Sequence, residues 1–81
     1  MENSQQDNAV LKHITRLTER EEHLYGKEAI TDADVSELHR IKQELDQYWD
    51  LLRQRRALRD AGGDPDRAAK RPVDQIENYE E

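Results

Sequence analysis

The chain has 81 residues, of which 40% are charged and 33% hydrophobic, and a formal net charge of −6 at pH 7. This length allows one small domain whose core supplies little surplus stability. The absence of cysteine excludes disulfides and thiolate metal sites. The acidic balance argues against a generic nucleic-acid binder. No apolar run approaches the roughly 20 residues of a membrane span, and the polar N-terminus has no signal-peptide pattern, so we expect a cytoplasmic protein.

The first predicted helix covers residues 7–25 and follows a frayed polar N-terminus at residues 1–6. We expect Asp7 or Asn8 to cap it and Gly26 to end it in the left-handed conformation. Its apolar residues recur at steps of four, three and seven, which indicates a helix packed against a neighbour. The residues of this stripe are Val10, Ile14, Leu17 and Leu24.

The second predicted helix covers residues 32–61. Thr31, with Asp34 three residues later, resembles a capping box at its start. Two consecutive glycines, Gly62 and Gly63, stop the helix at its other end. Its apolar residues also recur at steps of three and four: Val35, Leu38, Ile41, Leu45, Tyr48 and Leu52.

The short link between these helices predicts an all-α fold, an antiparallel two-helix hairpin of the coiled-coil-like kind with unequal arms. The second helix would extend more than two turns beyond the first. Folding the chain at the link predicts which apolar residues meet. The pairs are Leu24 with Val35, Leu17 with Leu38 and Ile41, Ile14 with Leu45, and Val10 with Tyr48.

The overhanging turns need cover, and the sequence offers two candidates. The C-terminal tail, residues 62–81, can fold back on the longer helix. It would place Val73, Ile76 and Tyr79 on the overhang, with Asp74 and Glu77 facing the arginines. Alternatively, a second copy can pair with the first to form a four-helix bundle, and both can operate together.

The segment from Asp46 to Arg59 combines the only tryptophan with four arginines. Counting Lys and Arg against Asp and Glu, residues 49–63 carry +2, whereas residues 1–31, 32–48 and 64–81 carry −2, −3 and −3. Aromatic and arginine side chains are enriched in binding hot spots. We therefore predict a partner-binding face made of Trp49, Leu52, Arg53, Arg56 and Arg59.

These residues also have a purely structural interpretation. Arg53, Arg55 and Arg56 can pair with Asp50 and Asp60 along the helix, or complement the helix dipole at its C-terminus. Trp49 can pack under the tail or across a dimer seam.

A search for chemistry finds no catalytic, cofactor or metal motif. The histidines His13, His23 and His39 lack the spacing by which one helix holds a metal. The run from Asp32 resembles the start of a calcium loop, but Glu37 replaces its glycine and Gln43 its final acid. We expect no enzyme and no cofactor, and a small helical interaction or adaptor module that docks a protein or itself. The alternatives are a nucleic-acid-associated regulator whose arginines contact phosphate, and metal or calcium sensing.

Three motifs carry a resemblance to a small actinobacterial family known only as domain of unknown function 2630. They are the run from Asp46 to Arg59, the Gly62–Pro65 turn, and Arg71-Pro-Val73 near the end. The Glu21-Glu22-His23 triplet also resembles the family pattern, whereas Tyr48 stands where relatives often carry a smaller residue. The resemblance implies a short cytosolic helical protein and no particular activity.

Overall fold

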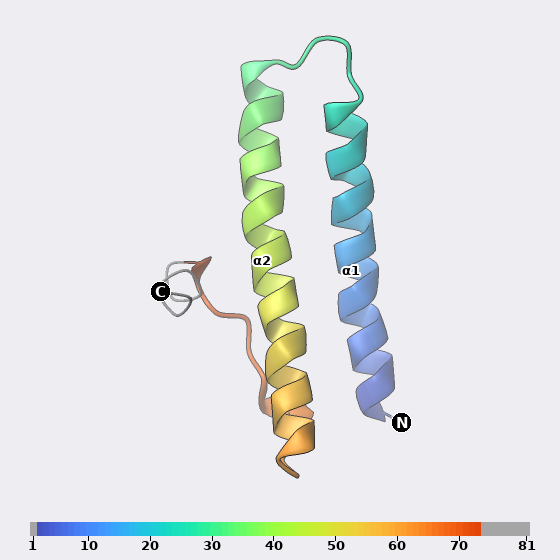
Figure 1. The fold of residues 1–81 in the computed structure, drawn as a ribbon, viewed down its shortest axis with the longest axis vertical. Helices are drawn as coiled ribbons and strands as arrows, with labels where there is room; N and C mark the ends of the chain where they lie inside the picture. The colour runs from blue at the N-terminus through green and yellow to red at the C-terminus, as the bar shows by residue number, and fades with distance from the viewer. Residues whose placement is uncertain (1, 74–81) are drawn as a thin grey trace.

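The computed structural model describes residues 2–73, with side chains from residue 6 onward. Helices α1 (Glu2–Tyr25) and α2 (Asp32–Asp60) lie side by side, and a short 3-10 helix, η1 (Pro65–Arg67), follows them (Figure 1). No strand occurs within residues 2–73. The molecule is a single layer of helices with principal extents of 49 × 30 × 14 Å. The predicted all-α hairpin is therefore confirmed.

The link between the helices is fixed by hydrogen bonds at the start of α2. The Asp34 N–H donates to the Thr31 hydroxyl oxygen at 3.1 Å, and the Thr31 N–H donates to the Asp34 carboxylate at 3.0 Å. This is the predicted capping box. Lys27 Nζ lies 2.7 Å from the same carboxylate. Lys27 first, and then Thr31, lower the pKa of Asp34 to about 2.

The prediction that Gly26 ends α1 in the left-handed conformation is wrong. Its N–H donates to the Glu22 carbonyl at 3.0 Å, so the helical bond pattern continues one residue further. Among the described residues, only Gly62 has a positive φ, 78°. The Gly62 N–H donates to Arg59 and the Gly63 N–H to Leu58, at 3.1 and 2.7 Å, which is the Schellman arrangement. Glycine is thus needed at the end of α2.

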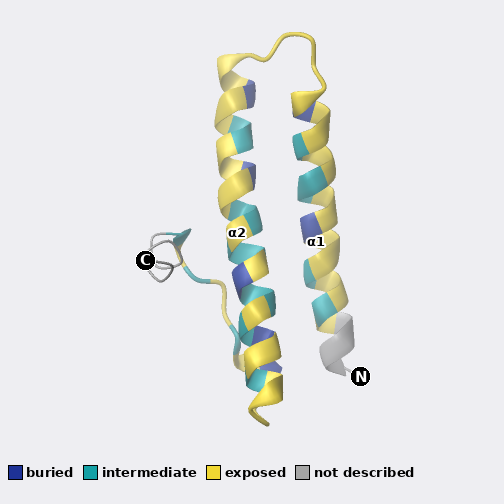
Figure 2. Cartoon of the chain, viewed as in Figure 1, coloured by how far each residue is buried: buried dark blue, intermediate teal, exposed yellow. Residues whose placement is uncertain are grey.

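The core between the helices is small. Its fully buried aliphatic side chains are Ile14, Leu24 and Ile41, at 6%, 1% and 1% exposure. The buried positions run along the facing sides of α1 and α2, and the outer sides are exposed except where the tail returns along the second half of α2 (Figure 2). Two flanking contacts define the register. The His13 and Tyr48 rings stack with centroids 5.1 Å apart, and Arg20 Nε lies 2.8 Å from Glu37 Oε2.

This register agrees with the predicted antiparallel pairing except near the link. Val35, predicted to lie against Leu24, is 55% exposed, whereas its neighbour Asp34 is buried. The capping box explains the difference, because it turns the Asp34 carboxylate back toward Thr31 and Lys27. The first apolar position of α2 is thereby rotated out of the core.

The N-terminal boundary also differs from the prediction. α1 begins at Glu2, so residues 2–6 are helical, although residues 1–6 were predicted to be frayed. Asp7 lies inside α1 and does not cap it. Because α1 starts earlier, its first turns run beside the end of α2 and leave a shorter overhang than predicted. Both helices still differ in length, with 24 and 29 residues.

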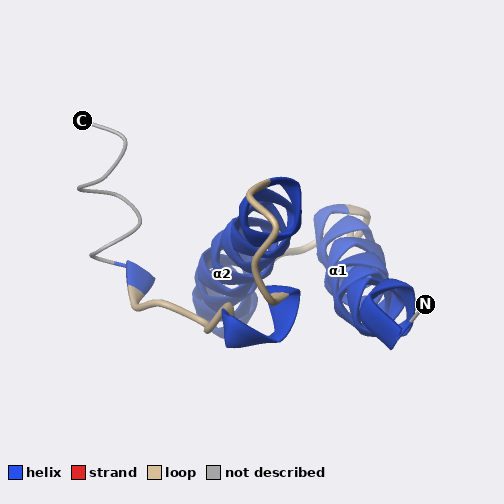
Figure 3. Cartoon of the chain, turned by 90° about the horizontal axis from the view of Figure 1, so that it is seen from below, coloured by secondary structure: helices blue, strands red, loops and turns tan. Residues whose placement is uncertain are grey.

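The described part of the tail folds back along α2, as predicted. Gln54 Nε2 donates to the Ala69 carbonyl at 2.8 Å, and Gln47 Nε2 donates to the Arg71 carbonyl at 3.1 Å. The Arg71 guanidinium also binds the Asp50 carboxylate through both Nε and Nη2. After η1 the tail runs along the side of α2 away from α1 (Figure 3). The expected roles of Ile76, Tyr79, Asp74 and Glu77 fall outside the described residues.

Acid should weaken the fold through Asp34. Its folded pKa of about 2 lies below its ordinary value of 3.8, so folding favours the ionised carboxylate. This contribution is complete above about pH 4 and is lost as the pH falls through about 2. We expect the urea midpoint of the wild-type protein to fall between pH 5 and pH 2, and that of Asp34→Asn to fall less. Asp32→Asn, an exposed neighbour, is the control. An equal fall in Asp34→Asn and wild type would contradict this assignment.

Candidate interaction face

The five predicted partner-binding residues all lie in the C-terminal half of α2, but they do not form one uniform patch. Trp49 is 47% exposed, Leu52 is half-buried, and the three arginines are exposed. Arg59 Nη2 already lies 2.6 Å from Asp7 Oδ2 of α1. Among the side chains that the structure describes, none forms an ion pair with Arg53 or Arg56. The partner-binding assignment therefore remains a prediction for this set.

Arg55, which was not among the predicted site residues, is the most connected side chain in this region. It is 3% exposed. Its Nε lies 2.5 Å from Asp7 Oδ1, and its Nη1 lies 3.1 Å from Asp66 Oδ1 and 3.2 Å from the Pro65 carbonyl. One guanidinium thus joins α1, α2 and η1.

The electrostatics of this cluster favour its charged form. Burial alone would lower the pKa of Arg55, but hydrogen bonds to Asp7 and Asp66 outweigh burial and raise it. Burial alone would raise the pKa of Asp7, but hydrogen bonds from Arg55 and Arg59 outweigh burial and lower it. Each ion is stabilised by its partners, as a buried charge requires.

The predicted pairing of the arginines with Asp50 and Asp60 is wrong for Asp50. This carboxylate, 4% exposed, accepts hydrogen bonds from Arg71 of the tail and from Gln54. The hydrogen bond from Arg71 is the main reason that the pKa of Asp50 is lowered. The prediction considered partners along the same helix. The Arg55–Asp7 pair and the Asp50–Arg71 pair each join two different segments of the chain. One signal for Arg55 existed, since it continues the step of seven from Ile41 and Tyr48 along the core side of α2.

Up to Val73 the tail does not cover Trp49, which is 47% exposed, and the rest of the tail expected to cover it falls outside the described residues. The tail is held by Gln47, Asp50 and Gln54, which project from the outer side of α2. Lys70 Nζ lies 4.3 Å from the centre of the Tyr48 ring, so the tail also reaches the flank where His13 stacks on Tyr48. Trp49 projects from the opposite flank, and its exposure remains high.

Helix geometry shows which residues share that opposite flank. Successive residues are rotated by 100° around a helix axis. In two antiparallel helices, residues that are displaced in the same rotational sense from the line facing the partner helix lie on the same side of the pair. Arg20 contacts Glu37, and His13 contacts Tyr48. All four residues are displaced in one sense. The residues displaced in the other sense define what we call the open face. They are Leu11, Thr15, Thr18, Glu22 and Tyr25 of α1, and Val35, Leu38, Lys42, Leu45, Trp49, Leu52, Arg53 and Arg56 of α2.

The open face carries most of the exposed apolar surface of the described chain. The described chain has five exposed large apolar side chains. Four of them belong to the open face: Leu11 at 40%, Tyr25 at 58%, Val35 at 55% and Trp49 at 47%. The fifth, Ile30, lies in the link. Exposed apolar side chains that gather on one flank mark an interaction site more often than scattered single residues do.

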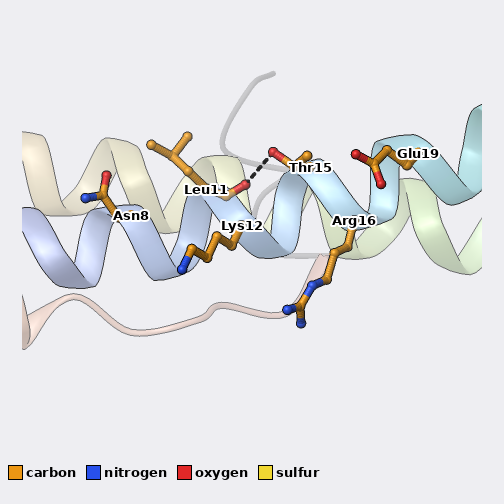
Figure 4. A pocket seen from close by; sticks show the side chains of 6 residues that line it. All are labelled: Asn8, Leu11, Lys12, Thr15, Arg16 and Glu19. Atoms are coloured by element: carbon orange, nitrogen blue, oxygen red, sulfur yellow. Dashed lines mark hydrogen bonds between the residues drawn. The ribbon is translucent and has the colours of Figure 1, made fainter.

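The outer side of α1 carries a shallow groove that reaches the open face only at Leu11 and Thr15 (Figure 4). Its lining residues all come from one helix: Asn8, Leu11, Lys12, Thr15, Arg16 and Glu19. The Thr15 hydroxyl donates to the Leu11 carbonyl at 3.0 Å, which satisfies the hydroxyl and leaves the threonine methyl group available for packing. A groove on a single helix does not enclose a small molecule. It is suited to contact with another macromolecule.

Within residues 2–73, no group of three or more His, Asp or Glu side chains is arranged to hold a metal ion. Neither helix in this part of the chain has an apolar stretch sufficient to cross a membrane.

Replacing Arg55 should destabilise the fold far more than replacing its exposed neighbour Arg56. Arg55→Met removes the guanidinium that joins Asp7 and Asp66, and the loss of these charge-assisted hydrogen bonds should cost about 2 kcal/mol. Arg56→Met should change the free energy of unfolding by less than about 0.5 kcal/mol. Urea denaturation followed by circular dichroism measures both. Similar losses in the two variants would show that the Arg55 cluster does not hold the hairpin together.

Comparison with known proteins agrees with this architecture. Residues 6–81 match the family described as "Protein of unknown function (DUF2630)". Uncharacterised proteins of Mycobacterium tuberculosis and Mycobacterium bovis are each 48% identical to the chain, with 90% of this chain and 88% of the relative covered. No solved structure matches. From its match over nearly the whole length, the chain belongs to the DUF2630 family.

Proposed function

We propose that this protein is a small non-enzymatic interaction module, cytoplasmic in location, that docks a protein partner through the open face. The observation that carries the proposal is the concentration of exposed apolar side chains on one flank of a single-layer hairpin. A stable domain normally buries its apolar face against a second layer. On this flank the described chain supplies no second layer.

The composition of the open face supports a protein partner. Trp49 and Arg56 lie seven residues apart on the same stripe of α2, with half-buried Leu52 between them. Tryptophan and arginine next to a partly desolvated aliphatic residue are the types that contribute most to protein interfaces. Leu11 and Tyr25 extend this surface onto α1.

The non-enzymatic part of the proposal is supported by the way the perturbed carboxyls are used. The pKa values of Asp7, Glu37 and Asp50 are lowered, and their cationic partners are Arg55 and Arg59, Arg20, and Arg71 respectively. Each pair joins separate segments of the fold. These carboxylates are stabilised as anions, which is the opposite of the raised pKa that a general acid needs.

Nucleic-acid binding through the arginines is the second candidate. Arg53 and Arg56 are exposed and could contact phosphate, which favours it. Arg55 and Arg59 are already bound to Asp7, which reduces the positive charge available. If phosphate contacts drive binding, affinity for a mixed-sequence DNA duplex should fall steeply between 50 and 200 mM salt, as about 10³-fold for six contacts. No measurable binding at 50 mM salt would remove this candidate.

The primary proposal is tested by the double variant Trp49→Ala/Arg56→Glu. Removing two hot-spot side chains should reduce capture of a specific protein partner from a lysate of the source cells at least about tenfold. Helix content should not change, because neither side chain is buried. Arg40→Gln, an exposed change on the tail-side flank, is the matched control and should capture partners normally. If the double variant captures the same proteins with the same yield as wild type, the open face is not the docking surface.

A further inference from the structure

We propose that the open face is covered by a second copy of this chain, with the two hairpins packed face to face and α2 crossing α2 of the second copy in the antiparallel sense. This inference rests on the proposed function and names the partner. The links between α1 and α2 in the two copies then lie at opposite ends of the assembly. The assembly is a four-helix bundle with a two-fold axis perpendicular to the helices.

The spacing of the open-face residues on α2 fits such a two-fold axis. Val35, Leu38, Lys42, Leu45, Trp49, Leu52 and Arg56 recur at alternating steps of three and four. The midpoint of this stripe falls between Leu45 and Asp46. A two-fold interface must be self-complementary, with residue i on residue j and j on i. An axis at this midpoint sets Val35 against Arg56 and Lys42 against Trp49 of the second copy, and it brings Leu38 within one residue of Leu52.

The contacts generated by this axis are chemically matched. Lys42 of one copy lies against Trp49 of the second copy, where an ammonium over an indole face is favourable. Leu38 lies opposite Arg53 and beside Leu52 of the second copy, and both leucines are half-buried already. The leucines at 45 meet across the axis. The only lysine in the stripe is therefore placed beside its only tryptophan.

The cations of the open face favour the antiparallel sense. A parallel two-fold pairing of α2 would set Lys42, Arg53 and Arg56 of each copy against the same residues of the other copy, and like charges that face each other are unfavourable. The antiparallel axis instead sets Lys42 against Trp49 and Arg56 against Val35.

The surface is large enough for a stable dimer. The stripe from Val35 to Arg56 spans 21 residue steps, or about 32 Å at 1.5 Å per residue. Two helices side by side are about 20 Å wide, so each copy would bury on the order of 600 Å², near the roughly 800 Å² per partner of standard interfaces. The α1 part adds no unsatisfied hydroxyl, because Thr15 donates to Leu11 and Thr18 to the Ile14 carbonyl at 2.8 Å.

Mass measurement in solution tests the assembly. Light scattering on the full chain at about 100 μM should give twice the monomer mass of 9.6 kDa. Trp49→Lys and Val35→Lys, which set an ammonium against Lys42 and Arg56 of the second copy without touching the core, should shift the mass to that of a monomer. Arg40→Gln should remain dimeric. A monomeric wild type overturns the proposal, as does a dimer that neither open-face variant dissociates.

Cross-linking tests the two-fold arrangement. The chain contains no cysteine, so a single introduced cysteine reports only on its own position. Leu45→Cys lies next to the axis and should form an intermolecular disulfide under mild oxidation, whereas Arg40→Cys on the opposite flank should not. A dimer in which both variants, or neither, cross-link overturns the arrangement.

These results separate the inference from the proposed function. If the wild type is monomeric but capture of another protein still depends on Trp49, the docking function stands and the second copy is not its partner. If capture and dimerisation are both unaffected by open-face variants, both proposals fail.

Discussion

Two helices in one layer can bury only one stripe each, and this constraint governs the molecule. The fully buried aliphatic side chains between α1 and α2 are Ile14, Leu24 and Ile41. The remaining apolar residues are shared between the margins of this seam and the open face. Such a core leaves little stability to spare, so the ends of the hairpin must be fixed by other interactions.

Polar contacts fix those ends. At the link, Asp34 joins the cap of α2 to Lys27. At the other end, Arg55 joins the start of α1 to the turn after α2, and the Asp50 pair with Arg71 holds the returning tail. Isolated surface ion pairs contribute little, but Asp34, Asp50 and Arg55 are buried, and loss of a single partner would leave a desolvated charge. The charge-rich composition is thus partly structural, and the open face is left with Lys42, Arg53 and Arg56 as its main cations.

Periodicity predicted the parts of the fold that depend on local sequence. The capping box at Thr31, the stop at Gly62 and the antiparallel register all follow from residue types at short spacings, and the structure contains them. The exposure of Val35 was not predicted, because it results from the inward turn of Asp34, a hydrogen-bonding effect that the apolar pattern does not contain. The early start of α1 was missed for a similar reason: its first turns are polar, and Asp7 is held by Arg55, 48 residues away. Pairing rules within one helix cannot identify such partners. For the candidate site, the sequence identified Trp49 and its helix, and the hairpin then showed that Leu11 and Tyr25 of the other helix share the same flank.

If a second copy covers the open face, the only tryptophan of the chain becomes buried when copies meet. Acrylamide quenching of Trp49 fluorescence over a range of protein concentration is the most direct test. With Trp49 47% exposed in the single chain, we predict strong quenching and red-shifted emission in dilute solution, and a blue shift with reduced quenching as concentration rises. Emission that stays red-shifted and fully quenchable up to the highest concentration reached would contradict the account.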